Sequence, residues 1–116
     1  MRNKILPLVA LAAVTAIAAG PAAQGSPQAT RTVAVGNDFF SPRKLTVGAG
    51  TTVRWRWRRG ADAHNIKLRR GPRGVRRFSS KTRDAPFSFR RRLSRRGTYS
   101  MICTLHSGMT QRITVK

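Results

Sequence analysis

The stretch that decides the fold is Thr52–Arg58, which reads Thr-Val-Arg-Trp-Arg-Trp-Arg. Apolar and cationic side chains alternate along it: Val53, Trp55 and Trp57 fall on one parity and the arginines on the other. A period of two over this length fits a half-buried β-strand and does not fit a helix. The stretch therefore predicts a strand that buries its tryptophan face and exposes its arginine face to solvent.

Short segments of similar character lie on both sides of this strand, separated by turn residues such as Gly36–Asp38 and Gly48–Gly50. We expect further strands over residues 32–35, 45–47, 64–68, 86–93, 97–103 and 110–116. Residues 39–42 are interpreted as a connection, and residues 69–83 as a long loop with room for one short strand near 75–78. No helical periodicity and no internal repeat follows residue 30. The pattern predicts an all-β fold, a two-sheet antiparallel sandwich.

The N-terminus has the order of a secretory signal peptide: a basic start, an apolar run from Ile5 to Ala19, and small residues after it. We predict a signal peptide over residues 1–25, cut between about 18 and 25, a flexible leader over 26–30, and one domain over 31–116. An uncleaved membrane anchor is the alternative, but the run is short for a hydrocarbon core, which needs about 20 residues. The protein is therefore expected to be exported, to the periplasm or to the outside of the cell.

The charge of the chain is extreme. Lys and Arg number 24 against three acidic residues, a net charge of +21, and loss of Arg2 and Lys4 with the signal would leave +19. Such an excess indicates anionic partners or surroundings and says nothing about the fold. An arginine-rich composition without any function is the alternative, and most of the arginines have the parity of solvated side chains. The sequence leaves this choice open.

The segment Cys103–Met109, Cys-Thr-Leu-His-Ser-Gly-Met, places a thiol, an imidazole and a thioether in one short loop between two predicted strands. Thiolate and thioether are soft ligands, and with imidazole they select copper over hard cations. Cys103 is the only cysteine, so it cannot form an internal disulfide, and metal ligation would both use and protect its thiol. The only other histidine is His64, which would complete the set. We predict one copper ion held by His64, Cys103, His106 and Met109.

Zinc is the rival metal, and the ligand types argue against it. Structural zinc sites make little use of methionine, and catalytic ones need an open position. A carboxylate base would also have to lie nearby, and Asp62 is the only acid close to a predicted ligand in sequence.

The motifs together resemble the cupredoxins, the type 1 (blue) copper family of plastocyanin, amicyanin and pseudoazurin. The resemblance covers residues 30–116 and lies in the segment Phe40–Trp55, in His64-Asn65-Ile66, in Gly97-Thr98-Tyr99 and in the Cys-x-x-His-x-x-Met loop. The short gap before Met109 is similar to that of amicyanin. The resemblance implies a Greek-key sandwich of about eight strands with copper near one end. It also implies that Asn65 ties the two ligand loops together, with its backbone N–H on the Cys103 sulfur and its side chain near Thr104.

The ligand set and the resemblance together imply an exported carrier of single electrons, a monomer and not an enzyme, in which the electron leaves through the exposed edge of His106 beside Leu105. The expected partner is an acidic redox protein, a cytochrome or an oxidase, and the charge suggests association with an anionic envelope surface. A copper carrier or buffer is one alternative. A cationic binder of anionic polymers, lipid head groups or nucleic acid is another, but we expect no specific nucleic-acid binding, because Trp55 and Trp57 are predicted to be buried rather than free to stack on bases.

Overall fold

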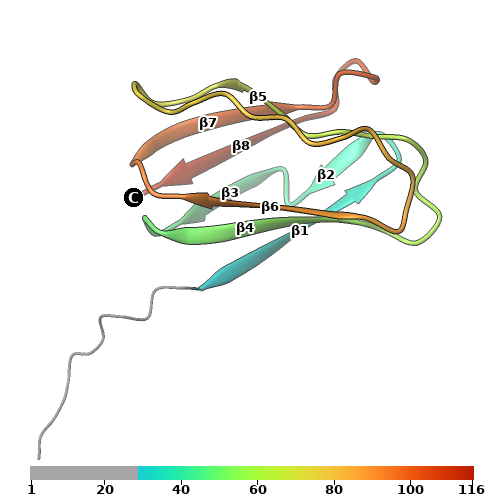
Figure 1. The fold of residues 1–116 in the computed structure, drawn as a ribbon, viewed down its shortest axis with the longest axis horizontal. Helices are drawn as coiled ribbons and strands as arrows, with labels where there is room; N and C mark the ends of the chain where they lie inside the picture. The colour runs from blue at the N-terminus through green and yellow to red at the C-terminus, as the bar shows by residue number, and fades with distance from the viewer. Residues whose placement is uncertain (1–28) are drawn as a thin grey trace, which may run out of the picture.

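The computed structural model describes residues 29–116, which form two four-stranded sheets packed as a sandwich (Figure 1). The first sheet contains, in order across it, β2 (Phe39–Ser41), β1 (Thr30–Gly36), β4 (Thr51–Trp57) and β6 (Ser88–Leu93). The second contains β3 (Lys44–Val47), β8 (Thr110–Val115), β7 (Gly97–Ile102) and β5 (Lys67–Arg70). The prediction of an all-β sandwich of about eight strands is confirmed. Among the described residues, no helix of a length and hydropathy suited to crossing a bilayer occurs.

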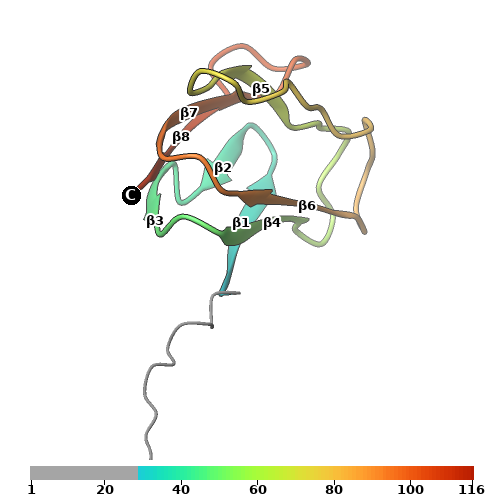
Figure 2. The same ribbon diagram turned by 60° about the vertical axis from the view of Figure 1, so that its left-hand side comes forward.

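The chain passes repeatedly from one sheet to the other, as Figures 1 and 2 show, and this fixes the direction of each strand. Between β1 and β4 it leaves the first sheet to form β3 and then returns, so that β4 runs parallel to β1. β3 likewise runs parallel to β8, and the other four pairings among the described residues are antiparallel. The sheets are therefore mixed, whereas the sequence predicted antiparallel pairing throughout. Strand alternation reveals which residues face inward but not the direction of the neighbouring strand.

The tryptophan face of β4 forms the centre of the core. Val53 and Trp55 are fully buried and Trp57 nearly so, as the alternation predicted. Trp55 packs on Phe89 of β6, with ring centroids 5.8 Å apart. Tyr99 and other residues of the second sheet close the core from the opposite side. Burial of these large side chains, about 1.5–3 kcal/mol for each aliphatic or phenyl group, supplies the main stabilisation of a chain that repels itself electrostatically.

Two segments differ from the expectation. Residues 39–41 form strand β2 beside β1, where a plain connection was predicted. The strand predicted over 64–68 is wrong at its start, because β5 begins only at Lys67. His64 instead forms an isolated bridge with Arg83, and the Ile66 N–H donates to the Ser80 hydroxyl in place of a strand partner.

The loop before β6 contains no strand near 75–78. Ser79 makes a single bridge with Lys67, and Phe78 turns its ring inward against Phe89, with centroids 6.1 Å apart. Phe78 thus fills the open side between β5 and β6, where the two sheets do not meet.

The predicted signal peptide and nearly all of the predicted leader lie outside the described residues. Of the leader, only Ala29 and Thr30 are described, and Thr30 already belongs to β1, where it is in register with Thr52 of β4.

One buried polar link joins the two sheets. The Trp55 indole Nε1–H donates to Gln111 Oε1 at 2.9 Å, and Gln111 Nε2–H donates to the Pro42 carbonyl oxygen at 2.7 Å. Gln111 is only 2% exposed; its bond with Trp55 is buried, and its bond with the exposed Pro42 is partly buried. The amide therefore connects β4, β8 and the segment that leads into β3.

We expect Gln111→Leu to lower the free energy of unfolding by about 1–3 kcal/mol, because it leaves the buried Trp55 N–H without a partner. Urea unfolding of the copper-free protein, followed by tryptophan fluorescence, measures this loss. The double variant Trp55→Phe with Gln111→Leu should cost less than the two single changes added together, since each removes a partner of the other. Additive costs would show that the bond contributes nothing.

Candidate metal centre

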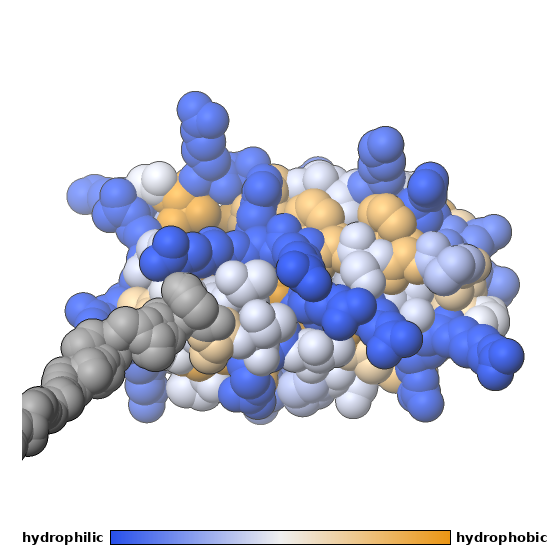
Figure 3. Space-filling view, turned by 60° about the horizontal axis from the view of Figure 1, so that its bottom comes forward, coloured by the Kyte–Doolittle hydropathy of each residue, from blue (hydrophilic) through white to orange (hydrophobic). Residues whose placement is uncertain are grey.

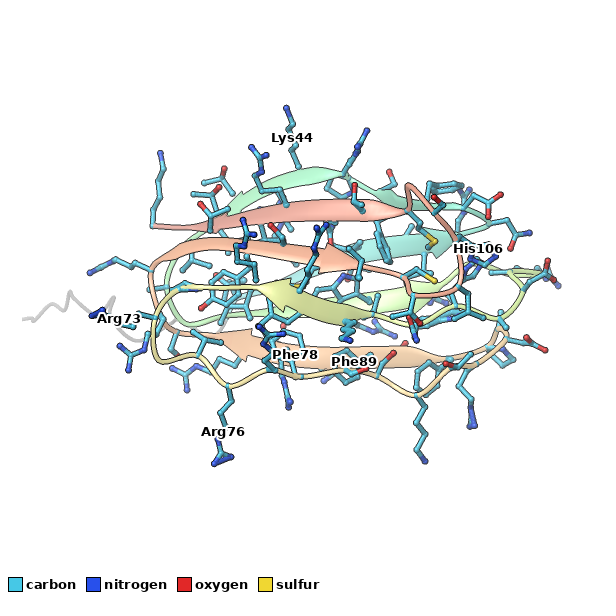
Figure 4. The ribbon with its side chains drawn as sticks, turned by 90° about the horizontal axis from the view of Figure 1, so that it is seen from above. Lys44, Arg73, Arg76, Phe78, Phe89 and His106 are labelled. Carbon is cyan, nitrogen blue, oxygen red and sulfur yellow. The ribbon has the colours of Figure 1, made fainter. Side chains whose placement is uncertain are left out.

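Two loops meet at the end of the sandwich where β4 and β7 both finish. The β4–β5 connection carries His64, and the β7–β8 loop carries Cys103 and His106. In Figure 4, His106 lies at the opposite end of the sandwich from Arg73. The candidate centre is therefore terminal, at the end away from the turn that follows β5.

Three donor atoms converge there. The distance from His64 Nδ1 to His106 Nδ1 is 3.2 Å, and that from His64 Nδ1 to Cys103 Sγ is 3.9 Å. The distance from Cys103 Sγ to His106 Nδ1 is 3.6 Å. These three residues are the one group of three or more potential His, Cys or acidic ligands found among the described residues.

This triangle has the size that a single transition-metal ion requires. Bonds of about 2.0 Å to nitrogen and 2.3 Å to sulfur, meeting at about 105–130°, place their donor atoms about 3.2–3.9 Å apart. Two imidazoles and a thiolate in a trigonal arrangement are the donor set of a blue-copper centre, which takes a weak axial ligand besides. The residues present therefore fit copper.

Backbone hydrogen bonds close the β7–β8 loop tightly. The Cys103 N–H donates to the Met109 carbonyl oxygen at 3.0 Å, and the Met109 N–H donates to the His106 carbonyl oxygen at 3.2 Å. Gly108 has a φ of 81°, a left-handed conformation that glycine adopts without steric cost. Met109 is 1% exposed, so its thioether is turned into the protein at the loop that carries Cys103.

The two imidazoles differ in exposure. His64 is fully buried, whereas the His106 side chain is 33% exposed. Burial lowers the pKa of His64 below its ordinary value of 6.5, and the charge of His106 lowers that pKa further. A lowered pKa keeps the His64 ring neutral, which is the form that binds a metal.

Asn65 links the two loops through its side chain. Its Oδ1 accepts a hydrogen bond from the Thr104 N–H at 2.9 Å, and its Nδ2–H donates to Thr104 Oγ1 at 2.9 Å and to Thr82 Oγ1 at 3.3 Å. This pair of bonds places the residue after His64 against the residue after Cys103. The bond expected from the Asn65 backbone N–H to the Cys103 sulfur stays a prediction.

The turn between β1 and β2 contacts both histidines, a role that was not predicted from the sequence. Asn37 Oδ1 accepts from His64 Nε2–H at 2.9 Å and also from the Asp62 N–H at 2.9 Å. Asp38 Oδ1 lies 3.6 Å from His106 Nε2. Because Asn37 holds Nε2–H, the Nδ1 lone pair of His64 faces the other donors.

The sequence of this segment indicated only a turn. Gly36-Asn37-Asp38 marks the end of a strand, and Asp38 has the left-handed φ of 69° that acidic and amide residues tolerate. Its position beside the histidines follows from the parallel pairing of β1 with β4, which brings the ends of both strands to the same end of the sheet.

All three acidic side chains of the sequence lie near this centre. Asp38, Asp62 and Asp84 each act to raise the pKa of His64, against the larger effects of burial and of His106. The end that carries the histidines therefore holds all of the negative side chains in a protein dominated by arginine.

Comparison with known proteins decides the family. The sequence profile described as copper binding proteins, plastocyanin/azurin family, matches residues 28–116. The chain belongs to this family. Its cofactor is copper, and the donor geometry described above is that of a type 1 site. No curated protein matches the chain in sequence.

Solved amicyanin structures share the fold. An oxidised amicyanin variant has a TM-score of 0.66 and 22% identity, covering 75% of this chain and 82% of its own. A variant in the reduced Cu(I) form at pH 4 has a TM-score of 0.66 and 23% identity, with coverages of 81% and 88%. Another oxidised variant reaches 24% identity at a TM-score of 0.66 and covers 85% and 90%.

Replacing Asn37 by Ala should weaken copper binding by about 10–100-fold, because the His64 ring loses the bond that fixes its tautomer and orientation. Competition against a chelator of known affinity measures the change. Asn37→Asp is the matched control: it keeps an acceptor oxygen at the same position and should retain most of the affinity. Unchanged affinity in Asn37→Ala would mean that the turn does not support the centre.

Proposed function

We propose that the protein is an exported carrier of single electrons, whose copper would be held by His64, Cys103 and His106 and, more weakly, by Met109. One observation carries this proposal: the Cys103 sulfur and two imidazole nitrogens lie at mutual distances of 3.2–3.9 Å in a chain of the plastocyanin/azurin family. The burial of Met109 on the same loop supports its assignment as the fourth ligand.

When bound, copper supplies a one-electron couple between Cu(I) and Cu(II). The role of the chain is to hold the donor atoms in one arrangement for both oxidation states. Asn37 fixes the His64 ring, and Asn65 fixes the loop that carries Cys103. Ligands held by such outer contacts move little when the charge at the centre changes, and a small rearrangement permits fast transfer.

The surface around His106 suits brief contact with another protein. Among the described residues, the large hydrophobic side chains that are exposed are Leu105, at 46%, and Phe39, at 37%. Leu105 precedes His106, and Phe39 follows Asp38, whose carboxylate lies 3.6 Å from the His106 ring. The exposed Leu105 side chain, next in sequence to a partly exposed imidazole, supports electron exit at His106. We assign no catalytic role to the centre and regard the protein as a carrier rather than an enzyme.

Export and partner belong to the same proposal. The signal-like segment 1–25 supports export to the periplasm or the outside of the cell. A net charge of +19 after its removal favours association with an acidic redox protein, such as a cytochrome or an oxidase, by electrostatic steering. The same charge opposes self-association, so we propose a monomer.

Electron self-exchange tests the carrier function. In mixtures of the Cu(I) and Cu(II) forms, line broadening in NMR spectra gives the exchange rate, and Leu105→Glu should slow it by about tenfold because it places a charge in the contact surface. Thr98→Glu is the control: it makes the same change in net charge at the start of β7, the end of that strand away from Cys103, and should leave the rate nearly unchanged.

Two results would contradict the proposal. Equal self-exchange rates for the two variants would show that the electron does not leave through the His106 edge. Undetectable exchange in the unmodified protein, with rapid loss of copper to a chelator, would identify a copper buffer in place of an electron carrier.

A further inference from the structure

The outer face of the first sheet carries four arginines at adjacent positions. Arg54 of β4 lies directly opposite Arg90 of β6, and Arg56 and Arg92 occupy the next positions of the same face on the two strands. We call these four residues the arginine face. Figure 3 looks toward this side of the sandwich, where hydrophilic side chains cross the surface and project from its rim.

The pairing of Arg54 with Arg90 works against folding. Directly opposed side chains in an antiparallel pair lie about 4.5–5.5 Å apart at Cβ, and like charges there are destabilising. No carboxylate relieves the repulsion: within residues 29–116 no arginine or lysine is found paired with an acidic side chain, and Asp38 instead lies 3.6 Å from His106. Asp62 and Asp84 also lie toward the copper end, where they act on His64. The arginine face is therefore uncompensated by the protein itself.

Arg54 has a second unusual feature. Its Nε is buried and has no hydrogen-bond partner among the described residues. A buried donor without an acceptor lowers the stability of the fold. The strongest hydrogen bonds that a guanidinium makes are those it donates to anionic oxygens. A hollow of about 810 Å³ opens beside it; Arg54 and Arg56 of the arginine face line it, together with Arg59 and Gly60 of the β4–β5 connection and residues 85–88. The face thus combines charge, an unsatisfied donor and space for a ligand.

We propose that the arginine face binds a polyol-phosphate chain of the cell envelope, a linear polymer whose units are joined by phosphodiester groups. Alternate residues of a strand lie about 6.6–6.8 Å apart and neighbouring strands about 4.8 Å apart, so the four guanidinium groups offer a row of closely spaced positions for successive phosphates. The planar guanidinium fork matches phosphate oxygens in pairs.

The chemistry of the face favours a linear polymer over a bilayer. A protein that lies on a membrane usually inserts apolar side chains below the head groups. None of the exposed large hydrophobic residues of the described part stands among the four arginines: Leu105 lies on the β7–β8 loop, and Phe39 packs over Gly36 beside Arg58 at the copper end of the first sheet. Polymer bound to the sheet face would leave the His106 edge free for a redox partner, and this consequence rests on the proposed function. The binding of the polymer does not depend on that function.

The test measures binding of the copper-loaded protein to fluorescently labelled poly(glycerol phosphate) by anisotropy at several salt concentrations. Arg54→Gln with Arg90→Gln should weaken binding by about tenfold at low salt and reduce the slope of log affinity against log salt by about 1.4, near 0.7 for each lost phosphate contact. The control is Lys44→Gln with Arg112→Gln, which removes the same charge at paired positions of the second sheet. It should change the affinity by less than about threefold and leave the slope nearly intact.

Equal losses in the two double variants would overturn the proposal, since they would reduce it to an effect of net charge. Tighter binding to phosphatidylglycerol vesicles or to duplex DNA than to the polymer would also overturn it. Thermal unfolding of each variant checks the fold, and the Arg54 and Arg90 variant should be at least as stable as the unmodified protein at low salt, because a repulsive pair is removed. The readout is polymer binding, so its failure is distinguishable from a failure of electron exchange.

Discussion

The two hydrogen bonds between the Asn65 amide and Thr104 are the constraint on which the centre depends. They join the β4–β5 connection, which leads from the first sheet to the second, to the β7–β8 loop within the second sheet, and the bonded residues lie 39 positions apart in the chain. With these loops fixed, His64 and Cys103 cannot separate, and the tight turn to Met109 carries His106 to the same point. The donor triangle is thus set by the protein rather than gathered by the metal, as electron transfer with little rearrangement requires.

The distribution of charge follows from the same architecture. Strand alternation directs the tryptophans of β4 inward and its arginines outward, so the core stays apolar although the chain has 24 basic residues. The three carboxylates gather at the copper end, close to His64. The sandwich therefore has an end with mixed charge, where the metal lies, and a sheet face that is purely cationic. Such a division permits a contact surface for a redox partner and a separate one for a polyanion.

Much of the fold was predictable because burial leaves a strong period of two in the sequence. Residues 52–58 revealed the central strand, and the dense Cys103–Met109 segment revealed the metal and three of its proposed ligands. His64 could be predicted as a ligand because it is the only histidine in the chain besides His106. The structure brings the thiolate and both imidazoles together.

What the sequence could not reveal depends on contacts between distant segments. Asn37 and Asp38 looked like an ordinary turn, because their approach to the histidines requires β1 to run parallel to β4, and alternation carries no information on direction. The strand expected to start at His64 fails because residues 64–66 pair with an irregular loop through the Ser80 hydroxyl and a single bridge to Arg83. Strand β2 was missed because three residues are too few to show a period.

The absorption spectrum of the protein titrated with Cu(II) tests the central claim most directly. A thiolate and two imidazoles closing on one copper ion should give an intense visible charge-transfer band at one equivalent, and Cys103→Ser should abolish the band while leaving the sandwich folded. A colourless complex, or a band that survives the loss of the Cys103 sulfur, would contradict the assignment of this site.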